Sequence, residues 1–455
     1  MTGSEPTPSG PSSGWIVLVP LLLGILGSGL SMSLISVPAP VIAAEVSLSD
    51  TGRAWLVDSY PLCLAAGLLF AARLGDRFGR RTVLVIGLGA MALGNAVAML
   101  ASAGLVLIIT RAITGLAGGA VIASVVATIG TRFRGRDLAI ANGAWVATVG
   151  AGNALGPVLG GVLTDRLGWR SVFAALVAIA SIAALAAIRL LPESRGAGRP
   201  GFDPVDLILS GVGLGVIVHA VKRLAAAPVE GTGLLVIGVA LLAVFVRRQR
   251  RATDPLLDVA LFARRRVSVS AIQLLISAAA AGACIYLVSV HLQLAEDRSP
   301  SQAGLALVPL ALATTAGGLL APLTHARLGS ALVVRIALGV QAAGALATGL
   351  GVVPLPAALA LVGLGYGAVG TIATTALFEA ATPRRAAQAG VIQEIAFAVG
   401  TGLGIAAFST VAAIDPVLGF PIALVAAAAT ALGAALLPTG VPTHTHSAAD
   451  DRPSQ

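Results

Sequence analysis

Charged side chains are scarce in this chain of 455 residues. They make up only 11% of it, whereas 57% of the residues are hydrophobic. An ordinary soluble protein carries about a quarter charged residues, so a soluble domain of this composition would have too little polar surface to stay in solution. The sequence therefore predicts an integral membrane protein that is embedded in the lipid bilayer.

Lysine is almost absent, because the 29 basic residues include a single lysine, Lys222. The arginines do not form one patch but recur in short clusters between apolar segments. This distribution argues against nucleic acid as a partner. It is typical of cytoplasmic loops, which carry an excess of basic residues in membrane proteins.

Cysteine is rare as well, and both residues, Cys63 and Cys284, fall inside apolar runs. Small buried hydrophobic side chains are expected there rather than a disulfide. The chain has no cluster of cysteine and histidine for a metal, no nucleophile arrangement and no P-loop motif for ATP. We therefore expect no enzyme, no metal site and no cofactor.

Long apolar segments dominate what is present. A spanning helix needs about 20 mostly apolar residues, and fourteen segments qualify. Their approximate ranges are 15–38, 54–73, 82–101, 104–130, 138–163, 170–191, 204–223, 232–249, 267–291, 303–324, 330–351, 355–379, 386–412 and 417–437. With the N-terminus inside, the cytoplasmic loops and tail hold about 21 arginines against about six basic residues outside. Both termini are therefore expected in the cytoplasm.

Fourteen segments divide into two blocks of six and an additional pair. The expected organisation is a tail at 1–14, a six-helix bundle at 15–191, two inserted helices with flanking cytoplasmic loops at 192–266, a second bundle at 267–437 and a tail at 438–455. Repeats of six helices are typical of transporters, whose substrate path lies between the halves. Both tails are polar and expected to be disordered, and the chain is expected to be a monomer in the bacterial inner membrane.

The loop ARLGDRFGRR after the second segment brings both signs of charge into a short turn. Asp76, Arg77, Arg80 and Arg81 surround Gly79. A carboxylate there could cap a neighbouring helix or pair with an arginine, and the bond could break when helices move. The residues are predicted to form a conformational latch; the alternative is a topology signal alone.

An arginine lies inside the fourth segment, in RAITGLAGGAV. Arg111 is about 10 Å from the start of that helix at 1.5 Å per residue. A charge at this depth costs about 2.5–3.5 kcal/mol even on a lenient insertion scale, so it should face a cavity or a partner. Coupling to protons or substrate and a structural pairing with a carboxylate or carbonyl both stay open.

The fifth segment, GAWVATVGAGNALGPVLGG, is unusually rich in residues that weaken a helix. Its pattern comprises Gly143, Gly152, Gly156, Pro157, Gly160 and Gly161. Glycines at a spacing of four residues make a smooth face for another helix, and the proline removes a backbone hydrogen bond. The pattern predicts a closely packed, pliable helix contact.

Together these motifs resemble the major facilitator superfamily. ARLGDRFGRR is similar to its signature loop, with Ala72 where a glycine is usual, and the fifth segment is similar to the motif of its antiporter branch at all six positions. Fourteen segments, DPLLDVALF and QAGLALVPLAL resemble the drug:proton antiporters with fourteen helices. The resemblance implies two six-helix bundles plus two inserted helices, and efflux driven by the proton gradient.

The resemblance also implies roles for individual residues. Trp55, Asp58 and Tyr60 match a W-x-x-D-x-Y pattern of quaternary-ammonium and dye exporters, where the acid is implicated in cation recognition or proton coupling. An interfacial carboxylate facing water is the alternative for Asp58. Ser31 stands where the family usually has an acid in its first helix. Serine cannot carry a proton near neutral pH, so coupling would rest on other acids.

Glu394 is the deepest acid of the second half, roughly 12 Å from the cytoplasmic end of its helix. Exporters of this branch have a glutamate at the matching place. An apolar cavity favours the protonated form of a carboxyl group, so Glu394 is the first candidate for proton coupling, with a structural carboxylate as the alternative. Ser31, Trp55, Tyr60, Trp145 and Phe397 are candidate cavity residues.

The sequence therefore predicts a proton-coupled exporter of lipophilic, cationic compounds that works by alternating access. Its partners would be a small lipophilic substrate, protons and the bilayer. Three alternatives remain: a dedicated exporter of one endogenous metabolite or antibiotic, an importer or symporter, and a membrane sensor without transport.

Overall fold

A computed structural model describes residues 15–133, 135–195, 203–224, 227–252, 255–380, 386–415 and 418–438. The predicted tail at 1–14 lies outside these ranges, as does the predicted tail at 438–455 except for its first residue. The described residues form helices joined by short loops and turns, with no strand among them. The all-helical fold class expected from the sequence is thereby confirmed for the described residues.

Each of the predicted apolar segments lies on a helix. The first group comprises α2 (Leu18–Ser33), α3 (Ala39–Glu45), α4 (Asp50–Phe78), α5 (Arg80–Leu100), α6 (Gly104–Arg132), α7 (Gly135–Leu167) and α8 (Arg170–Leu190). The middle group comprises α9 (Pro204–Arg223), α10 (Pro228–Arg251) and η1 (Val259–Ala263). The last group comprises α11 (Arg265–Leu294), α12 (Pro300–Ala306), α13 (Val308–Leu350), α14 (Leu355–Ala380), α15 (Ala386–Ala412) and α16 (Gly419–Ala435).

Among the described residues, nine helical stretches are long and apolar enough to cross a membrane. Helices α2 and α16 are apolar but shorter. Helices α4, α7 and α9 correspond to predicted segments and fall outside these nine. The total of fourteen spans and the cytoplasmic position of both termini stay predictions.

The helix ends differ from the predicted segment ends in an informative way. The two segments predicted at 303–324 and 330–351 run together in α13, which changes direction at Gly329, where φ is +76°. A positive φ is readily available only to glycine, so one glycine makes the turn without a loop. The short helices α3 and α12 were not predicted, because seven residues carry too little periodic pattern.

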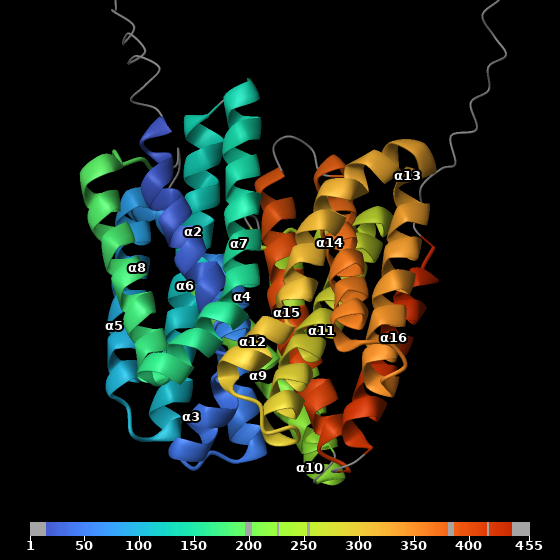
Figure 1. Cartoon of the computed structure of the whole chain (residues 1–455). Coiled ribbons are helices and arrows are strands. Elements are labelled where there is room, and N and C mark those ends of the chain that lie inside the picture. The colour runs from blue at the N-terminus through green and yellow to red at the C-terminus, as the bar shows by residue number, and fades with distance from the viewer. Residues whose placement is uncertain are drawn as a thin grey trace, which may run out of the picture.

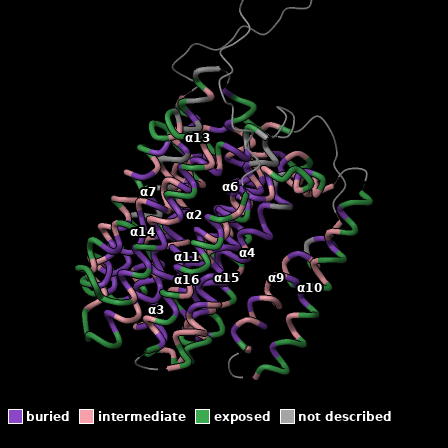
Figure 2. Tube along the Cα trace, turned by 90° about the vertical axis from the view of Figure 1, so that its right-hand side faces the viewer, coloured by how far each residue is buried: buried purple, intermediate pink, exposed green. Residues whose placement is uncertain are grey.

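The helices form two groups that stand side by side in Figure 1. Helices α2 to α8 make up one group and α11 to α16 the other. The pair α9 and α10 packs together at the edge of the molecule, as Figure 2 shows, and α9 also contacts α4 and α15. We call the groups the first half, the second half and the inserted pair; their independence as domains stays a prediction.

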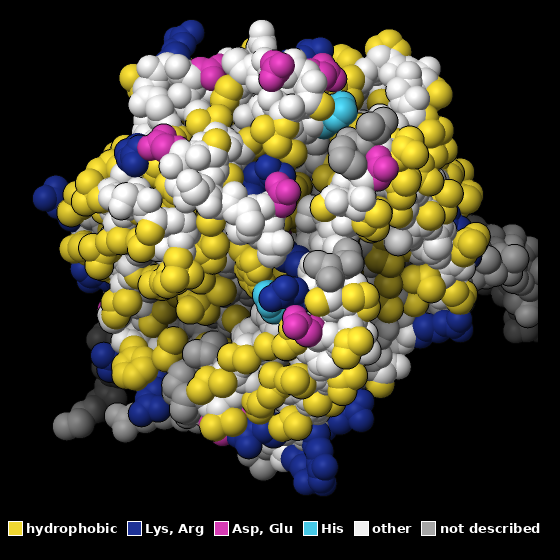
Figure 3. Space-filling model, turned by 90° about the horizontal axis from the view of Figure 1, so that it is seen from below, with side chains coloured by type: hydrophobic (Ala, Val, Ile, Leu, Met, Phe, Trp, Pro, Cys, Tyr) yellow, Lys and Arg dark blue, Asp and Glu magenta, His cyan; other side chains and the backbone are white. Residues whose placement is uncertain are grey.

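The outer surface of the molecule carries many large apolar side chains. Leu93, Leu320 and Leu323 are examples, with more than half of each side chain exposed. A monomeric soluble protein rarely exposes contiguous apolar surface of this extent, whereas lipid solvates it. Seen from below in Figure 3, charged side chains lie singly or in small groups among hydrophobic ones.

Hydrogen bonds join the two halves at one end of the molecule, which we call the Ser301 end. The backbone amide of Ser301 donates to a carboxylate oxygen of Asp165 at 2.9 Å. The side-chain amide of Gln293 donates to the carbonyl oxygen of Val37 at 2.8 Å. The opposite end, where α4 meets α5, we call the Gly79 end.

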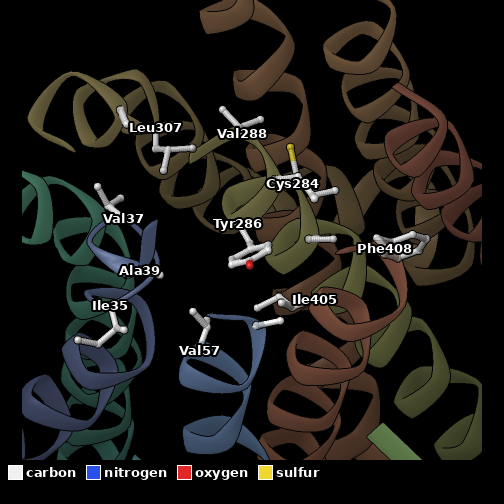
Figure 4. Close-up of a cluster of buried hydrophobic side chains, with 14 of the residues drawn as sticks. Ile35, Val37, Ala39, Val57, Cys284, Tyr286, Val288, Leu307, Ile405 and Phe408 are labelled. Atoms are coloured by element: carbon white, nitrogen blue, oxygen red, sulfur yellow. The ribbon is translucent and has the colours of Figure 1, made fainter. Parts of the chain in front are cut away.

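An apolar cluster reinforces the junction at the Ser301 end. In Figure 4, Val57 from the first half lies beside Tyr286 and Ile405 from the second, and Ile35 and Val37 of the first half belong to the same buried cluster. These side chains are nearly inaccessible to solvent, and burying each contributes roughly 1.5–3 kcal/mol. The conformation is therefore closed at the Ser301 end.

Candidate functional site

The glycines of α7 lie directly against α2. A Cβ atom added to Gly152 would lie 3.2 Å from the backbone of Gly29, and one added to Gly160 would lie 2.2 Å from the carbonyl oxygen of Leu34. The hydroxyl of Ser33 donates to the carbonyl oxygen of Gly152 at 3.2 Å. The smooth helix face predicted from the sequence is present, and its partner is α2.

The other part of the pattern faces the second half. A Cβ atom on Gly161 would lie 2.3 Å from the carbonyl oxygen of Pro300, and one on Gly304 would lie 2.5 Å from that of Pro157. Helix α7 therefore packs between α2 and α12, so it contacts both halves where they close. Gly143 lies on α7 as well, but its contacts do not belong to the part of the chain that the structure describes.

The latch loop turns at Gly79, where φ is +107°. Asp76 and Arg80 form an ion pair at 3.0 Å across the turn. The Arg80 guanidinium also donates to the carbonyl oxygen of Ala127 at 3.0 Å and to the Thr131 hydroxyl at 2.8 Å, both on α6. Arg81 donates to the carbonyl oxygen of Ile188 on α8, while Arg77 is exposed.

A carboxylate that the sequence analysis passed over caps α5. Glu193 accepts hydrogen bonds from the backbone amides of Arg81 and Thr82 at 3.1 and 3.2 Å, and from the Thr82 hydroxyl at 2.5 Å. A Cβ atom on Gly79 would lie 2.4 Å from the Glu193 carboxylate. Glycine is thus required both for the backbone conformation and for the approach of this acid.

The cap has an electrostatic signature. Burial alone raises the pKa of Glu193, but the hydrogen bonds from Thr82, Ser194 and Arg81 outweigh it and hold that pKa below its ordinary value of 4.5. A negative charge at a helix N-terminus is favourable. Glu193 follows Pro192 at the end of a predicted span. The position of an acid directly after a helix was the signal in the sequence that could have identified this cap.

Asp58 is fully buried on α4, so it is not an interfacial carboxylate facing water. One of its oxygens lies 2.7 Å from the ammonium nitrogen of Lys222 on α9, and the two side chains are 0% and 2% exposed. The same ammonium lies 4.3 Å from the centre of the Trp55 ring. Trp55 and Asp58 are one helical turn apart and therefore face the same neighbour.

Lys222, the ion-pair partner of Asp58, was not among the residues expected from the sequence. The prediction placed it at the end of a span and gave it no role beyond loop charge. The available signal was a single lysine at the end of an apolar segment in a chain that otherwise uses arginine.

Tyr60 points to a different neighbour, Arg111 on α6. The Arg111 guanidinium lies 4.5 Å from the centre of the Tyr60 ring, and its Nε donates to the carbonyl oxygen of Leu56 at 3.3 Å. The Tyr60 hydroxyl donates to the carbonyl oxygen of Ser28 at 3.1 Å. Arg111 thus has the carbonyl partner that was one of the two expectations.

This cluster is tightly built around Arg111. The terminal nitrogens of Arg111 are buried without a hydrogen-bond partner among the described residues, and the same holds for the hydroxyl of Ser31. A Cβ atom on Gly115 would lie 2.3 Å from the carbonyl oxygen of Tyr60, so α4 and α6 are in direct backbone contact. Within the described chain, Arg111 has no carboxylate partner.

Glu394 lies on α15, partly exposed and without a hydrogen bond or ion pair to another described residue. It is close enough to Tyr366 on α14 for the two groups to interact electrostatically. The Tyr366 ring packs edge-on against Phe397, one turn from Glu394, with ring centres 6.1 Å apart. Trp145 is buried on α7, and its ring nitrogen has no described partner.

The two candidate acids lie at different levels of the molecule. A Cβ atom on Gly402 would contact Leu62 at 3.0 Å, which marks where α4 and α15 cross. These helices run in opposite directions, so Asp58 lies four residues from the crossing toward the Ser301 end and Glu394 lies eight toward the Gly79 end. At 1.5 Å per residue the separation is about 18 Å along the axes.

The predicted residues therefore form several clusters rather than one site. Trp55 and Asp58 meet Lys222, and Tyr60 meets Arg111. Along the helix axes, Glu394 lies about 18 Å from Asp58 and Phe397 about 14 Å. The latch residues are at the Gly79 end.

The chain is similar to known membrane proteins over most of its length. The family model of the major facilitator superfamily matches residues 21–405. The multidrug efflux pump LfrA of Mycolicibacterium smegmatis is 31% identical over 419 residues, which cover 90% of this chain and 83% of that protein.

Two further relatives show the same extent of similarity. The tetracenomycin C resistance and export protein of Streptomyces glaucescens is 28% identical over 428 residues, covering 89% of this chain and 79% of that protein. The methyl viologen resistance protein SmvA of Salmonella typhimurium is 27% identical over 410 residues, which cover 87% of this chain and 81% of that protein. The match over most of the chain, the helical fold and the motifs on α4 and α7 lead to one conclusion: the chain belongs to the major facilitator superfamily.

Proposed function

We propose that the chain is a proton-coupled efflux transporter that exports lipophilic, cationic compounds across the bacterial inner membrane. It is a multi-pass membrane transporter rather than an enzyme, as its family and its efflux-pump relatives indicate. It is proposed to need no cofactor and to act as a monomer, with the proton gradient as the source of energy.

One observation carries the proposal: Glu394 is a partly exposed carboxyl group without a counter-charge in the described part of the chain. In apolar surroundings such a group binds either a proton or a cationic substrate. Competition between the two for one carboxyl group is sufficient for exchange in opposite directions, because binding of one releases the other.

The packing of α7 supports exchange rather than leak. Its glycines allow close contact with α2, and its Pro157 and Gly161 contact α12 of the second half. We infer that this contact seals the Ser301 end while Glu394 is reached from the Gly79 end. Opening of the Ser301 end would then let substrate leave and a proton bind.

The test is ethidium transport by the purified protein in vesicles with an imposed pH gradient. The variants are Glu394→Gln and, as a matched control, Glu379→Gln, which removes an acid that is already paired with Arg266 at 2.7 Å. Efflux should fall at least tenfold in Glu394→Gln and stay near the wild-type rate in the control. Equal rates in all three proteins would contradict the role of Glu394.

A second candidate is a dedicated exporter of one antibiotic or metabolite with the same mechanism. The relative named for tetracenomycin C resistance and export favours it. Competition experiments would separate the two candidates, because a multidrug exporter is inhibited by several unrelated cations and a dedicated one is not. Proton movement in the same direction as substrate would indicate a symporter, and absence of flux for every compound would indicate a sensor.

A further inference from the structure

The ion pair of Asp58 and Lys222 is an unusual feature of the interior. Lys222 is the single lysine of the sequence, yet its ammonium group is almost completely buried, 2.7 Å from Asp58. Neither the Asp58 oxygens nor the ammonium nitrogen has a hydrogen-bond partner besides this ion pair among the described residues. The two charges therefore depend on each other.

The pair lies where three parts of the molecule meet. Asp58 belongs to α4 of the first half and Lys222 to α9 of the inserted pair. Tyr286, on α11 of the second half, is close enough to Asp58 to interact with it electrostatically. Arg53 donates to the Tyr286 hydroxyl at 3.2 Å, so the charged cluster bridges the halves near the Ser301 end.

The other titratable and charged groups nearby do not replace the lysine. Arg53 forms an ion pair with Asp50 at 2.9 Å. His219, one turn before Lys222, lies beside Trp55 with ring centres 6.1 Å apart. Lys222 is thus the cation that directly neutralises Asp58 in this conformation.

Two buried charges cannot separate without replacement. A lone carboxylate or ammonium group in a low-dielectric interior is strongly disfavoured. Lys222 lies in the last turn of α9, next to the exposed Arg223, so its long side chain could reach water at the Ser301 end. Asp58 is about 12 Å into its helix and would need a proton or another cation instead.

We propose that Lys222 is a tethered internal cation of the Asp58 site: it neutralises the carboxylate while the Ser301 end is closed and yields it to a proton or substrate cation when α9 and α4 separate there. The inserted pair then takes part in the transport cycle rather than filling space at the edge. This inference rests on the proposed function and adds a role for Asp58 that depends on the conformation.

A purely structural ion pair predicts different behaviour, and a double variant distinguishes the two. Lys222→Met combined with Asp58→Asn removes both charges, leaves none unpaired and should fold like the wild type. If the pair is a working part of the cycle, ethidium efflux driven by a pH gradient falls at least tenfold in the folded double variant. A folded double variant that transports at the wild-type rate would overturn the proposal.

A second measurement does not depend on transport. Dicyclohexylcarbodiimide modifies protonated carboxyl groups in apolar surroundings, and labelling of the peptide that contains Asp58 can be followed by mass spectrometry. Labelling should be slow in the wild type and at least tenfold faster in Lys222→Met. The matched control is Arg223→Met, which removes the neighbouring exposed cation and should label like the wild type.

The outcomes separate this inference from the proposed function. Equal labelling in the wild type and Lys222→Met would show that the lysine does not neutralise Asp58, and would overturn the inference. A wild type that moves no ethidium would remove the proposed function but leave the labelling result interpretable. Lys222→Arg keeps the cation and should retain slow labelling.

Discussion

Replacing Gly160 by alanine should loosen the contact between α7 and α2. The added Cβ atom would lie 2.2 Å from the carbonyl oxygen of Leu34. Because that oxygen belongs to the backbone of a helix, no side-chain rotation can relieve the overlap. The two helices must move apart by about 1 Å, which breaks the close packing of the interface.

The size of the effect follows from two opposing contributions. Adding a methyl group to a tightly packed interior costs about 1–3 kcal/mol, while alanine in a helix is favoured over glycine by about 1 kcal/mol. Gly89 on α5 provides the control, because an added Cβ atom there meets no atom within 4 Å. Gly89→Ala gains the helix preference without the overlap, so the difference between the variants isolates the packing contribution.

The assay is thermal unfolding of both purified variants in the same detergent. Gly160→Ala should unfold about 1–3 °C below Gly89→Ala, because a packing difference of about 1–3 kcal/mol shifts the unfolding temperature by about 1 °C per kcal/mol in a chain of this length. If both variants unfold at the same temperature, α7 and α2 are not in the close contact described, and the account of the glycine pattern is wrong.

Two other predictions concern the charged clusters. Glu193 has a lowered pKa in the folded protein, so its contribution to stability is present above its ordinary pKa and is lost as the pH falls through the lowered value. Glu193→Gln should therefore unfold at a lower temperature than the wild type at pH 7, and the difference should vanish in acid. A difference in unfolding temperature that does not depend on pH would contradict the capping role of Glu193. Arg111 is buried without a carboxylate partner in the described chain. The Arg111→Met variant should therefore lose no more than about 1 kcal/mol of stability, or gain stability, while its rate of ethidium efflux falls. A variant that unfolds readily yet transports normally would indicate that Arg111 has a structural role alone.

Local features of the fold were predictable from the sequence, and non-local ones were not. The helices on the apolar segments follow from composition alone, and the glycine face of α7 follows from its spacing. The partner of that face could not be predicted, because nothing local in the sequence indicates that Gly160 meets Leu34 or that Gly161 meets Pro300.

The charged residues show the same division. The latch was expected to use a carboxylate as a helix cap or as an ion-pair partner, and the structure divides these tasks between Glu193 and Asp76. Lys222 could not be assigned to Asp58, since the two are distant in sequence and the pair exists only through the packing of α9 on α4. Residue type indicated which groups could carry charge, and tertiary packing determined which ones meet.

Release of protons when substrate binds tests the central claim most directly. Ethidium is added to the purified wild type in weakly buffered solution, and the pH is followed together with binding. If Glu394 exchanges a proton for the cation, the wild type releases protons on binding and Glu394→Gln does not, while Glu379→Gln behaves like the wild type. Equal proton release by the wild type and Glu394→Gln would contradict the assignment of coupling to this glutamate.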